Sequence, residues 1–322
     1  MNTLPRISVV ICTYNRAHSL GKTLESVVVQ SVPPEIQWEV IVVDNNSSDQ
    51  TREIVEGFQN RYPERMRYAF EARQGVSNAR NTGVREALGQ IVAFIDDDET
   101  ADPNWLQSLT ANLFSGEWAG AGGRVQPQWG GPRPNWMSRK STFLDGPLAM
   151  FDYGAEAMQL NDPPFGANMA FRKEMLNKYG EFRTDLGRVG KEMLSGEDTE
   201  FGRRLIAGGE RLRYEPSAIT LHPVERDRAT RKYFLSWWFN KGRTDVRDFW
   251  TLTNLGKVSD IPWQVFRGAA VEAVRWIFTT EPCLRFICLL KIWTYAGQFS
   301  EYYRQSYAAK RKGSLLDSNS PS

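Results

Sequence analysis

The sequence predicts an α/β fold, in which a mostly parallel central sheet carries helices on both faces and a helical extension follows at the C-terminus. Three observations lead to this prediction. In the first hundred of the 322 residues, short apolar runs alternate with hydrophobic patterns of helical spacing. Polar and acidic clusters follow several of these runs directly, where the strands of a parallel sheet would end. Beyond residue 225, basic and aromatic residues dominate.

Strands and helices alternate closely in the N-terminal part. Each apolar run is short and nearly continuous, which suits a strand covered on both faces. Ser47 with Gln50 forms a capping-box pattern that predicts a helix start, and Ser77 predicts another. Because parallel strands are joined by right-handed crossovers, these units predict one sheet. The expected strands are 7–12, 40–43, 66–70 and 91–95, with helices around 20–28, 50–58 and 77–88.

The rest of the chain shows weaker patterns. Residues 116–164 are rich in Gly, Pro and Trp and predict irregular structure with short strands. We expect a strand over 165–172, a helix over 195–207 and a last short strand over 219–221. The predicted organisation is one domain over 1–224, in halves of about 1–115 and 116–224, a mainly helical extension over 225–309 and a disordered tail over 310–322.

Charge is distributed unevenly. The net charge of +2 argues against a protein that binds nucleic acid through bulk electrostatics. Residues 222–312 carry 16 Lys and Arg against 8 Asp and Glu, whereas the rest carries 24 against 30. The segment 269–299 is apolar with single interrupting charges, so it is too polar to span a bilayer but suits its interface. We expect the C-terminal helices to lie on a membrane, to pack on the rest of the chain or to form a homodimer.

The chain has three cysteines, which are too few for a disulfide framework.

Three consecutive aspartates, Asp96, Asp97 and Asp98, follow a predicted buried strand directly. Carboxylates at this spacing raise each other's pKa unless a cation lies among them, and they are preferred ligands of Mg²⁺ and Mn²⁺. The alternative is a solvated acidic turn that caps the helix expected near Pro103. Asp44, at the end of another strand, suits a nucleobase, a ribose hydroxyl or an Asx turn.

Other charged residues are expected at the same edge of the sheet. Arg16, Arg73 and Arg80 suit phosphate or base recognition, or else are ordinary surface charges. Glu197 and Asp198 open a predicted helix. Asp198 is therefore either a general base that takes a proton from a hydroxyl group or a helix cap.

His222, one of two histidines, follows the last predicted strand and either completes a metal site or is structural.

The sequence lacks the motifs of other nucleotide-binding and hydrolase classes. The Gly-rich stretch 120–123 lacks the third glycine of a dinucleotide-binding loop, and neither a P-loop nor a hydrolase nucleophile elbow is present. A nucleotidyltransferase would need a glycine-rich loop after the first strand, and residues 13–16 contain no glycine.

Together these motifs resemble the family 2 glycosyltransferases, whose catalytic domain has the GT-A fold. The resemblance covers about residues 5–224 and implies that 1–115 bind the nucleotide sugar and 116–224 the acceptor. The chain lacks the Gln-x-x-Arg-Trp motif and the transmembrane helices of the processive synthases in this family. The matching segments are 8–16, 39–49, 75–83, 94–98, 166–172, 196–198 and His222.

The resemblance implies roles for individual residues. Asp98 and His222 are the implied ligands of a divalent metal, Mn²⁺ or Mg²⁺. Asp198, with Glu197 beside it, is the implied catalytic base. The implied contacts of the donor sugar and acceptor are Gly166, Ala167, Asn168 and Glu197. The implied nucleotide-binding residues are Thr13, Tyr14, Asn15, Arg16, Asp44, Asn78, Arg80, Asp96 and Asp97.

The activity that this resemblance implies is inverting, metal-assisted transfer of a sugar from a nucleoside diphosphate sugar, most often a UDP sugar in this family. The acceptor is expected to be a hydroxyl of a saccharide or lipid-linked molecule in surface polysaccharide or glycoconjugate synthesis. Alternatives are a sugar nucleotidyltransferase and a non-catalytic nucleotide- or sugar-binding protein of the same fold. We expect the protein in the cytoplasm, peripheral on the inner face of the cell membrane.

Overall fold

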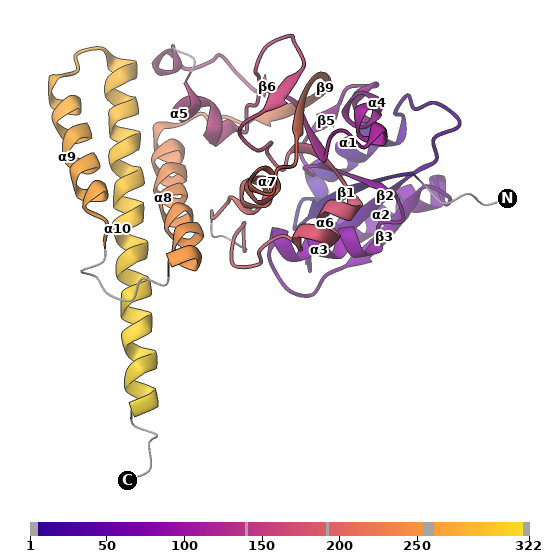
Figure 1. The fold of residues 1–322 in the computed structure, drawn as a ribbon. Helices are drawn as coiled ribbons and strands as arrows, with labels where there is room; N and C mark the ends of the chain where they lie inside the picture. The colour runs from indigo at the N-terminus through magenta and orange to yellow at the C-terminus, as the bar shows by residue number, and fades with distance from the viewer. Residues whose placement is uncertain (1–5, 139–140, 191–192, 254–260, 318–322) are drawn as a thin grey trace. The chain divides into compact units, whose positions relative to one another are not determined.

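The computed structural model describes residues 6–138, 141–190, 193–253 and 261–317 (Figure 1). The chain forms two compact units. The first, here called the sheet unit, consists of 1–130, 148–192 and 196–224. The second, the helical unit, consists of 131–147, 193–195 and 225–322.

The sheet unit is built around one mixed sheet with the strand order β3-β2-β1-β4-β8-β6-β9-β5, in which β7 also pairs with β9. Strands β1 to β4 are parallel to one another, and β8 runs antiparallel to both of its neighbours. The register places Thr13 beside Asp44, so the polar ends of β1 and β2 meet. The strands are β1 Ile7–Thr13, β2 Trp38–Asp44, β3 Met66–Phe70, β4 Ile91–Ile95, β5 Thr100–Ala101, β6 Gly120–Trp129, β7 Met158–Leu160, β8 Asn168–Arg172 and β9 Leu212–Val224.

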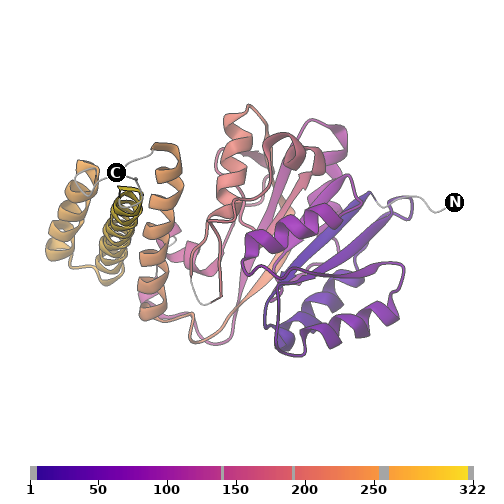
Figure 2. The same ribbon diagram turned by 90° about the horizontal axis from the view of Figure 1, so that it is seen from below.

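Helices cover both faces of this sheet, as predicted (Figures 1 and 2). Because side chains alternate along a strand, Val9 and Ile11 of β1 point into the core under α1, α2 and α4, while Val10 points toward α3. The second core also includes apolar residues of α6 and α7. The helices are α1 Ala17–Val28, α2 Thr51–Arg61, α3 Val76–Glu86, α4 Trp105–Thr110, α6 Lys173–Tyr179 and α7 Glu197–Ala207, with a 3-10 helix η1 at Ala111–Ser115.

Both predicted serine caps are wrong. Helix α2 begins at Thr51, where Asp49 accepts the Thr51 N–H at 3.1 Å, while the Ser47 hydroxyl accepts the N–H of Asn15 instead. Ser77 lies inside α3, and its hydroxyl donates to the carbonyl of Leu186 at 2.9 Å. Both serines are therefore used for tertiary contacts, which compete with local capping.

Two long strands replace structure that the sequence predicts as irregular or short. Strand β6 crosses the Gly-rich stretch, and β9 extends seven residues N-terminal to the predicted start at Ile219. Within β6, a Cβ on Gly120, Gly122 or Gly123 would collide with Phe171, Pro164 or Asn168, respectively. These glycines are thus required by close packing and do not indicate a loop.

The helical unit contains α5 Thr142–Asp145, α8 Arg231–Thr253, α9 Trp263–Phe278 and α10 Pro282–Asp317, and a 3-10 helix η2 at Asn135–Met137. Helix α10 lies between α8 and α9 and contacts both (Figures 1 and 2). It continues to Asp317, so most of the predicted disordered tail is helical; residues 318–322 lie outside the described part. Among the described residues, no helix has the length and apolar character needed to cross a membrane.

Candidate active site

The loops after β1 and β2 are bound to each other at the carboxyl edge of the sheet. Asn15 has a left-handed backbone, with φ of 52°, a conformation that asparagine tolerates. Its side-chain oxygen accepts the N–H of Ser48 at 2.8 Å, and its own N–H donates to Ser47 at 3.0 Å. The neighbouring Tyr14 is exposed, whereas Thr13 is buried at the end of β1. These hydrogen bonds join residues that the sequence places in two separate loops.

Asp44 is buried, and both of its carboxylate oxygens are engaged. One accepts the N–H of Ser47 at 2.8 Å, which is the Asx turn considered as an alternative. The other accepts the hydroxyl of Tyr68 at 2.9 Å. Burial and this hydrogen bond raise the pKa of Tyr68 to about 12, so its hydroxyl stays protonated and orients the Asp44 carboxylate.

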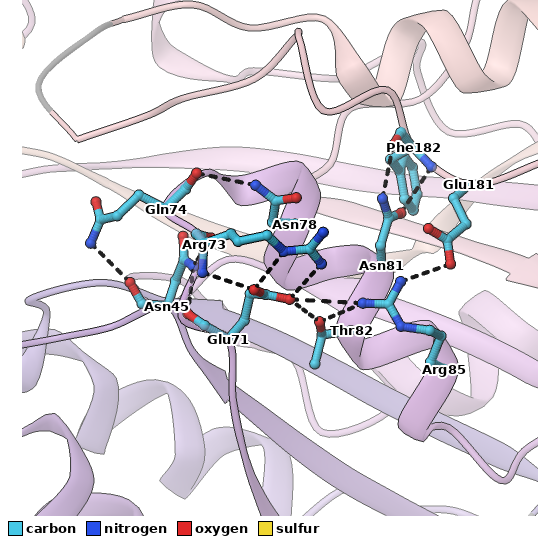
Figure 3. A network of polar contacts seen from close by, with 10 residues as sticks. All are labelled: Asn45, Glu71, Arg73, Gln74, Asn78, Asn81, Thr82, Arg85, Glu181 and Phe182. Atoms are coloured by element: carbon cyan, nitrogen blue, oxygen red, sulfur yellow. Dashed lines mark hydrogen bonds and ion pairs between the residues drawn. The ribbon is translucent and has the colours of Figure 1, made fainter.

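Asn45 fixes the loop between β3 and α3 (Figure 3). Its side-chain nitrogen donates to the carbonyls of Glu71 and Arg73, and its side-chain oxygen accepts the N–H of Gly75 at 2.7 Å. Asn78, one of the predicted nucleotide-binding residues, donates to the carbonyl of Gln74 in the same loop. The N-terminal end of α3 is therefore tied to the end of β2.

Glu71 organises the charged part of this loop (Figure 3). Its carboxylate accepts three hydrogen bonds from Arg73, at 2.8, 3.0 and 3.1 Å, and one from Thr82 at 2.6 Å. These bonds, with that of Arg73 the strongest influence, lower the pKa of Glu71 to about 2. Arg73, considered above as a phosphate-binding residue, is used here to hold the loop.

The carboxyl groups of the acidic run lie close to one another, and the pKa values of two of them are raised. Burial and the neighbouring Asp98 raise the pKa of Asp97 to about 7. Burial also raises the pKa of Asp96, against the attraction of Arg80 and Arg188. Both carboxyl groups are therefore held in surroundings where an added cation would favour their ionised forms.

Asp98 lies 3.4 Å from the guanidinium of Arg16, which comes from the loop after β1. The structure thus brings together the end of β1 and the acidic run after β4, two motifs separated by about eighty residues. Within the described residues, no three His, Cys, Asp or Glu side chains are grouped closely enough to hold a metal ion by themselves.

Arg80 connects the acidic run to the Glu-Asp motif. It is buried on α3, forms an ion pair with Glu197 and lies 3.8 Å from Asp96. Burial and the neighbouring Asp198 raise the pKa of Glu197, while Arg80 opposes this change. One guanidinium group is thus shared by carboxylates from two motifs about one hundred residues apart.

Asp198 is the second residue of α7, and its carboxylate is held from two sides. One oxygen accepts the N–H of Gly166 at 2.6 Å, and the other accepts the N–H of Thr199 at 2.6 Å. A Cβ on Gly166 would collide with the guanidinium of Arg80. The loop of Gly166 and the buried Ala167 therefore packs against the Glu-Asp motif and Arg80.

Asn168 and His222 are both buried. The Asn168 side chain accepts the indole N–H of Trp105 at 2.8 Å and donates to the carbonyls of Arg124 and Ala218. These bonds hold β8 to α4, β6 and β9, so the amide has a structural role where the sequence predicts a sugar contact. His222 lies on β9 opposite Pro127 of β6.

Sequence patterns do not single out Arg188. This residue follows the positive-φ Gly187 in the loop before α7, and its guanidinium opposes the rise that burial causes in the pKa of Asp96. Its carbonyl accepts the N–H of Val76 at 3.0 Å, which anchors the loop to the start of α3. No motif marks it, because its proximity to Asp96 arises only from tertiary folding.

A family model for glycosyl transferase family 2 matches residues 8–180, more than half of the chain. The chain belongs to this family. It is therefore a glycosyltransferase, and the matched segment contains the strand-end loops, the acidic run, Arg80 and Gly166. The Glu-Asp motif and His222 follow beyond the matched residues.

This glycosyltransferase is also similar in sequence to proteins with assigned names. It is 29% identical to the succinoglycan biosynthesis protein ExoM of Rhizobium meliloti over 247 residues, 76% of each chain. It is also 29% identical to a glucosyl-dolichyl phosphate glucuronosyltransferase of Haloferax volcanii, over 68% of this chain and 69% of that one.

The glycosyltransferase also shares its fold with solved structures. A mannosyltransferase from Pyrobaculum calidifontis, in complex with GDP-Man and Mn²⁺, is 20% identical and has a TM-score of 0.58, with 97% of this chain and 87% of that one covered. GalNAc-T7 with UDP, GalNAc and Mn²⁺ has a TM-score of 0.57 at 18% identity, over 80% and 54% of the two chains. These similarities support the GT-A fold predicted from the sequence.

Proposed function

We propose that this glycosyltransferase moves a sugar from a nucleoside diphosphate sugar to a hydroxyl of a saccharide or lipid-linked acceptor, with inversion at the anomeric carbon. Polysaccharide or glycoconjugate synthesis fits the relatives, one of which makes succinoglycan and another of which acts on a dolichyl phosphate-linked sugar. UDP is the donor nucleotide that we propose.

Arg80 carries this proposal, because its ion pairs with Glu197 and Asp96 join the two motifs that transfer requires. In a single displacement, a base deprotonates the acceptor hydroxyl while the leaving diphosphate gains charge on the other side of the sugar. We assign Asp198 as the base. Its hydrogen bonds from Gly166 and Thr199 fix the carboxylate, which is what proton abstraction from a positioned hydroxyl needs.

The nucleotide is assigned to the edge formed by Thr13, Tyr14, Asn15 and Asp44, with Asn78 and Arg80 at the start of α3. Exposed Tyr14 is the residue of this group with an aromatic face available for a base. Gly166 and Ala167 are assigned to the donor sugar and acceptor through their backbone.

The acidic run suits a divalent cation. Around it, the carboxylates of Asp96, Asp97, Asp98, Glu197 and Asp198 outnumber the guanidinium groups of Arg16, Arg80 and Arg188, and burial raises the pKa of Asp96 and Asp97. We propose Asp98 as a ligand, with His222 as a further one. When bound, Mn²⁺ or Mg²⁺ neutralises charge on the diphosphate leaving group.

Asp198→Asn tests the assignment of the base. Because the amide cannot take the proton, we expect transfer to fall by at least about 10²-fold while the affinity for the nucleoside diphosphate is unchanged. A panel of nucleotide sugars identifies the donor by release of nucleoside diphosphate, and calorimetry measures binding. Glu174→Gln removes an exposed carboxylate on α6 and serves as the control. Loss of nucleotide binding in Asp198→Asn would instead make Asp198 structural.

Asp98→Asn tests the metal ligand separately. We expect this variant to lose the stimulation of donor turnover by added Mn²⁺ or Mg²⁺, and to lose the increase in thermal stability that the metal with nucleoside diphosphate gives to the parent protein. Its melting temperature without ligands should stay close to that of the parent. A normal metal response in this variant would contradict the assignment.

A further inference from the structure

Helix α9 in the helical unit has an apolar face that is exposed to solvent. Trp263, Val274, Ile277 and Phe278 are 71%, 53%, 63% and 79% exposed. With Ala270, they recur at the helical spacing that places them on one side of the helix. The exposed face of an ordinary surface helix is polar, whereas the exposed face of α9 is apolar.

The opposite side of α9 packs against α10. Val265 is buried in a cluster with Tyr302, and Gly268 has no room for a Cβ because of Tyr295. Glu272 is buried as well and lies 3.4 Å from Lys291 of α10. The contacts with α10 therefore account for the inner side only, and both views place that helix on one side of α9 (Figures 1 and 2).

The charged residue on the exposed face itself is an arginine. Arg267 lies within the face and is exposed, and Arg275, on the flank of α9, is exposed and lies 2.8 Å from Glu272. Between residues 263 and 307 the acidic residues are Glu272, Glu281 and Glu301; Glu272 and Glu301 are buried, and the carboxylate of Glu281 accepts the N–H groups of Cys283 and Leu284 at the start of α10. The face thus combines large apolar side chains with a cation and contains no carboxylate.

We propose that this face of α9, defined by Trp263, Arg267, Val274, Ile277 and Phe278, docks on the surface of an anionic lipid bilayer. A helix of this kind lies in the interface with its apolar side chains in the acyl boundary, and tryptophan favours that depth. An arginine at an anionic surface adds electrostatic attraction to the lipid phosphate groups. Together the apolar side chains and the arginines suit reversible binding of a peripheral protein.

A second copy of the chain fits this face less well. In a two-fold symmetric dimer the same patch meets itself, so Arg267 would be buried against the partner's apolar face with no carboxylate of the patch to pair with. Burying an unpaired cation is costly. Phosphate groups of a lipid surface supply the anions that a second copy of this face lacks.

Co-sedimentation of the full-length protein with vesicles tests the proposal. The probes are phosphatidylglycerol–phosphatidylcholine vesicles and pure phosphatidylcholine vesicles at low salt. We expect binding to the anionic vesicles that weakens as salt is added. Ile277→Ser with Phe278→Ser should lower the partition coefficient by at least about tenfold, and Arg267→Gln should reduce the preference for anionic lipid.

Val29→Ser with Leu88→Ser is the matched control, since both residues are exposed apolar side chains of the sheet unit. This control should bind vesicles like the parent protein. Equal vesicle binding by the Ile277 and Phe278 variant, or no binding by the parent, would overturn the proposal. So would a concentration-dependent dimer in sedimentation velocity that the α9 substitutions dissolve. Because donor turnover is measured without lipid, it reports on the proposed function independently.

Discussion

Gly166 has no room for a side chain, because a Cβ there would collide with the buried guanidinium of Arg80. That guanidinium is buried and paired with Glu197, so a shift that makes room for the Cβ disturbs a buried ion pair. The absence of a side chain at Gly166 therefore leaves the space that the guanidinium group of Arg80 occupies. Either residue alone can be tested.

We expect Gly166→Ala to lower transfer by at least about tenfold, because displacing Arg80 disturbs both Glu197 and the N–H bonded to Asp198. The control is Gly57→Ala in α2, where nothing lies within 4 Å of the added Cβ. That substitution should keep activity and raise stability by about 0.5–1 kcal/mol, as expected for an exposed helical glycine. Initial rates and urea unfolding check both, and a fully active Gly166→Ala would contradict the pairing.

Arg80→Lys keeps the charge but loses the planar fork that reaches two carboxylates. We expect lower thermal stability than the parent, since a single ammonium group cannot replace the guanidinium contacts with both Glu197 and Asp96. We also expect a reduced kcat, measured by nucleoside diphosphate release. A lysine variant with parental stability and kcat would show that the shared contact with Glu197 and Asp96 is dispensable.

The roles of individual residues are predicted only in part from the sequence. The family motifs indicate Asp198 and Arg80, and the structure shows what each contacts. Asn168 has the same motif support, yet its amide is bonded to Trp105 and two carbonyls in the core. A motif indicates which residue type occurs at a position. It does not distinguish a residue that takes part in catalysis or binding from one that stabilises the fold. Arg188 lies outside every motif and is located by folding alone.

At the scale of elements, the loop between β3 and α3 depends on one carboxylate. Because hydrogen bonds hold the pKa of Glu71 near 2, below its ordinary value of 4.5, its ionised form stabilises the fold. This contribution is complete above pH 4.5 and is lost as the pH falls toward 2.

Glu71→Gln should therefore lower the free energy of unfolding at pH 7, and the difference from the parent should shrink steadily between pH 4.5 and 2.5. Urea unfolding at several pH values measures it. Glu53→Gln, on the exposed side of α2, controls for the loss of one negative charge. A difference that stays constant with pH would show that the Glu71 carboxylate is not the stabilising group.

Elements with a regular hydrophobic period are predicted well, whereas those shaped by tertiary contacts are not. Strands β1, β2 and β4 follow from apolar runs, because burial on both faces leaves that pattern in the sequence. Strand β6 lacks the pattern, since its glycines are selected by close neighbours. The predicted serine caps of α2 and α3 are wrong because Ser47 and Ser77 form hydrogen bonds with residues far along the chain.

At the scale of the whole molecule, the two units have separate polar anchors. In the helical unit, Glu301 is fully buried and accepts hydrogen bonds from Arg243 and Arg247 of α8 and from Arg304 of its own helix. Although burial opposes ionisation, Arg304 and Arg247 lower the pKa of Glu301. The sequence predicts the basic character of this region, but not the buried carboxylate around which its arginines gather.

Glu301→Gln should destabilise the helical unit by about 3 kcal/mol, because arginines grouped around a buried carboxylate lose their counter-charge. Hydrogen exchange read peptide by peptide is the measurement. We expect faster exchange in α8 and α10 and unchanged protection in β1, β2 and β4. Equal loss of protection in both units would show that they unfold as one.

The close packing of β6 has a consequence for how this chain tolerates genetic variation. Among all single substitutions, those at Gly120, Gly122 and Gly123 should be among the most strongly depleted in a library selected for folded protein, since even alanine collides there with a neighbour. Gly21 and Gly209 meet no such neighbour; Gly21 should accept most residues, and Gly209, with φ of 83°, chiefly asparagine or aspartate. A segment whose composition predicts irregular structure is thus one of the least replaceable parts of the protein.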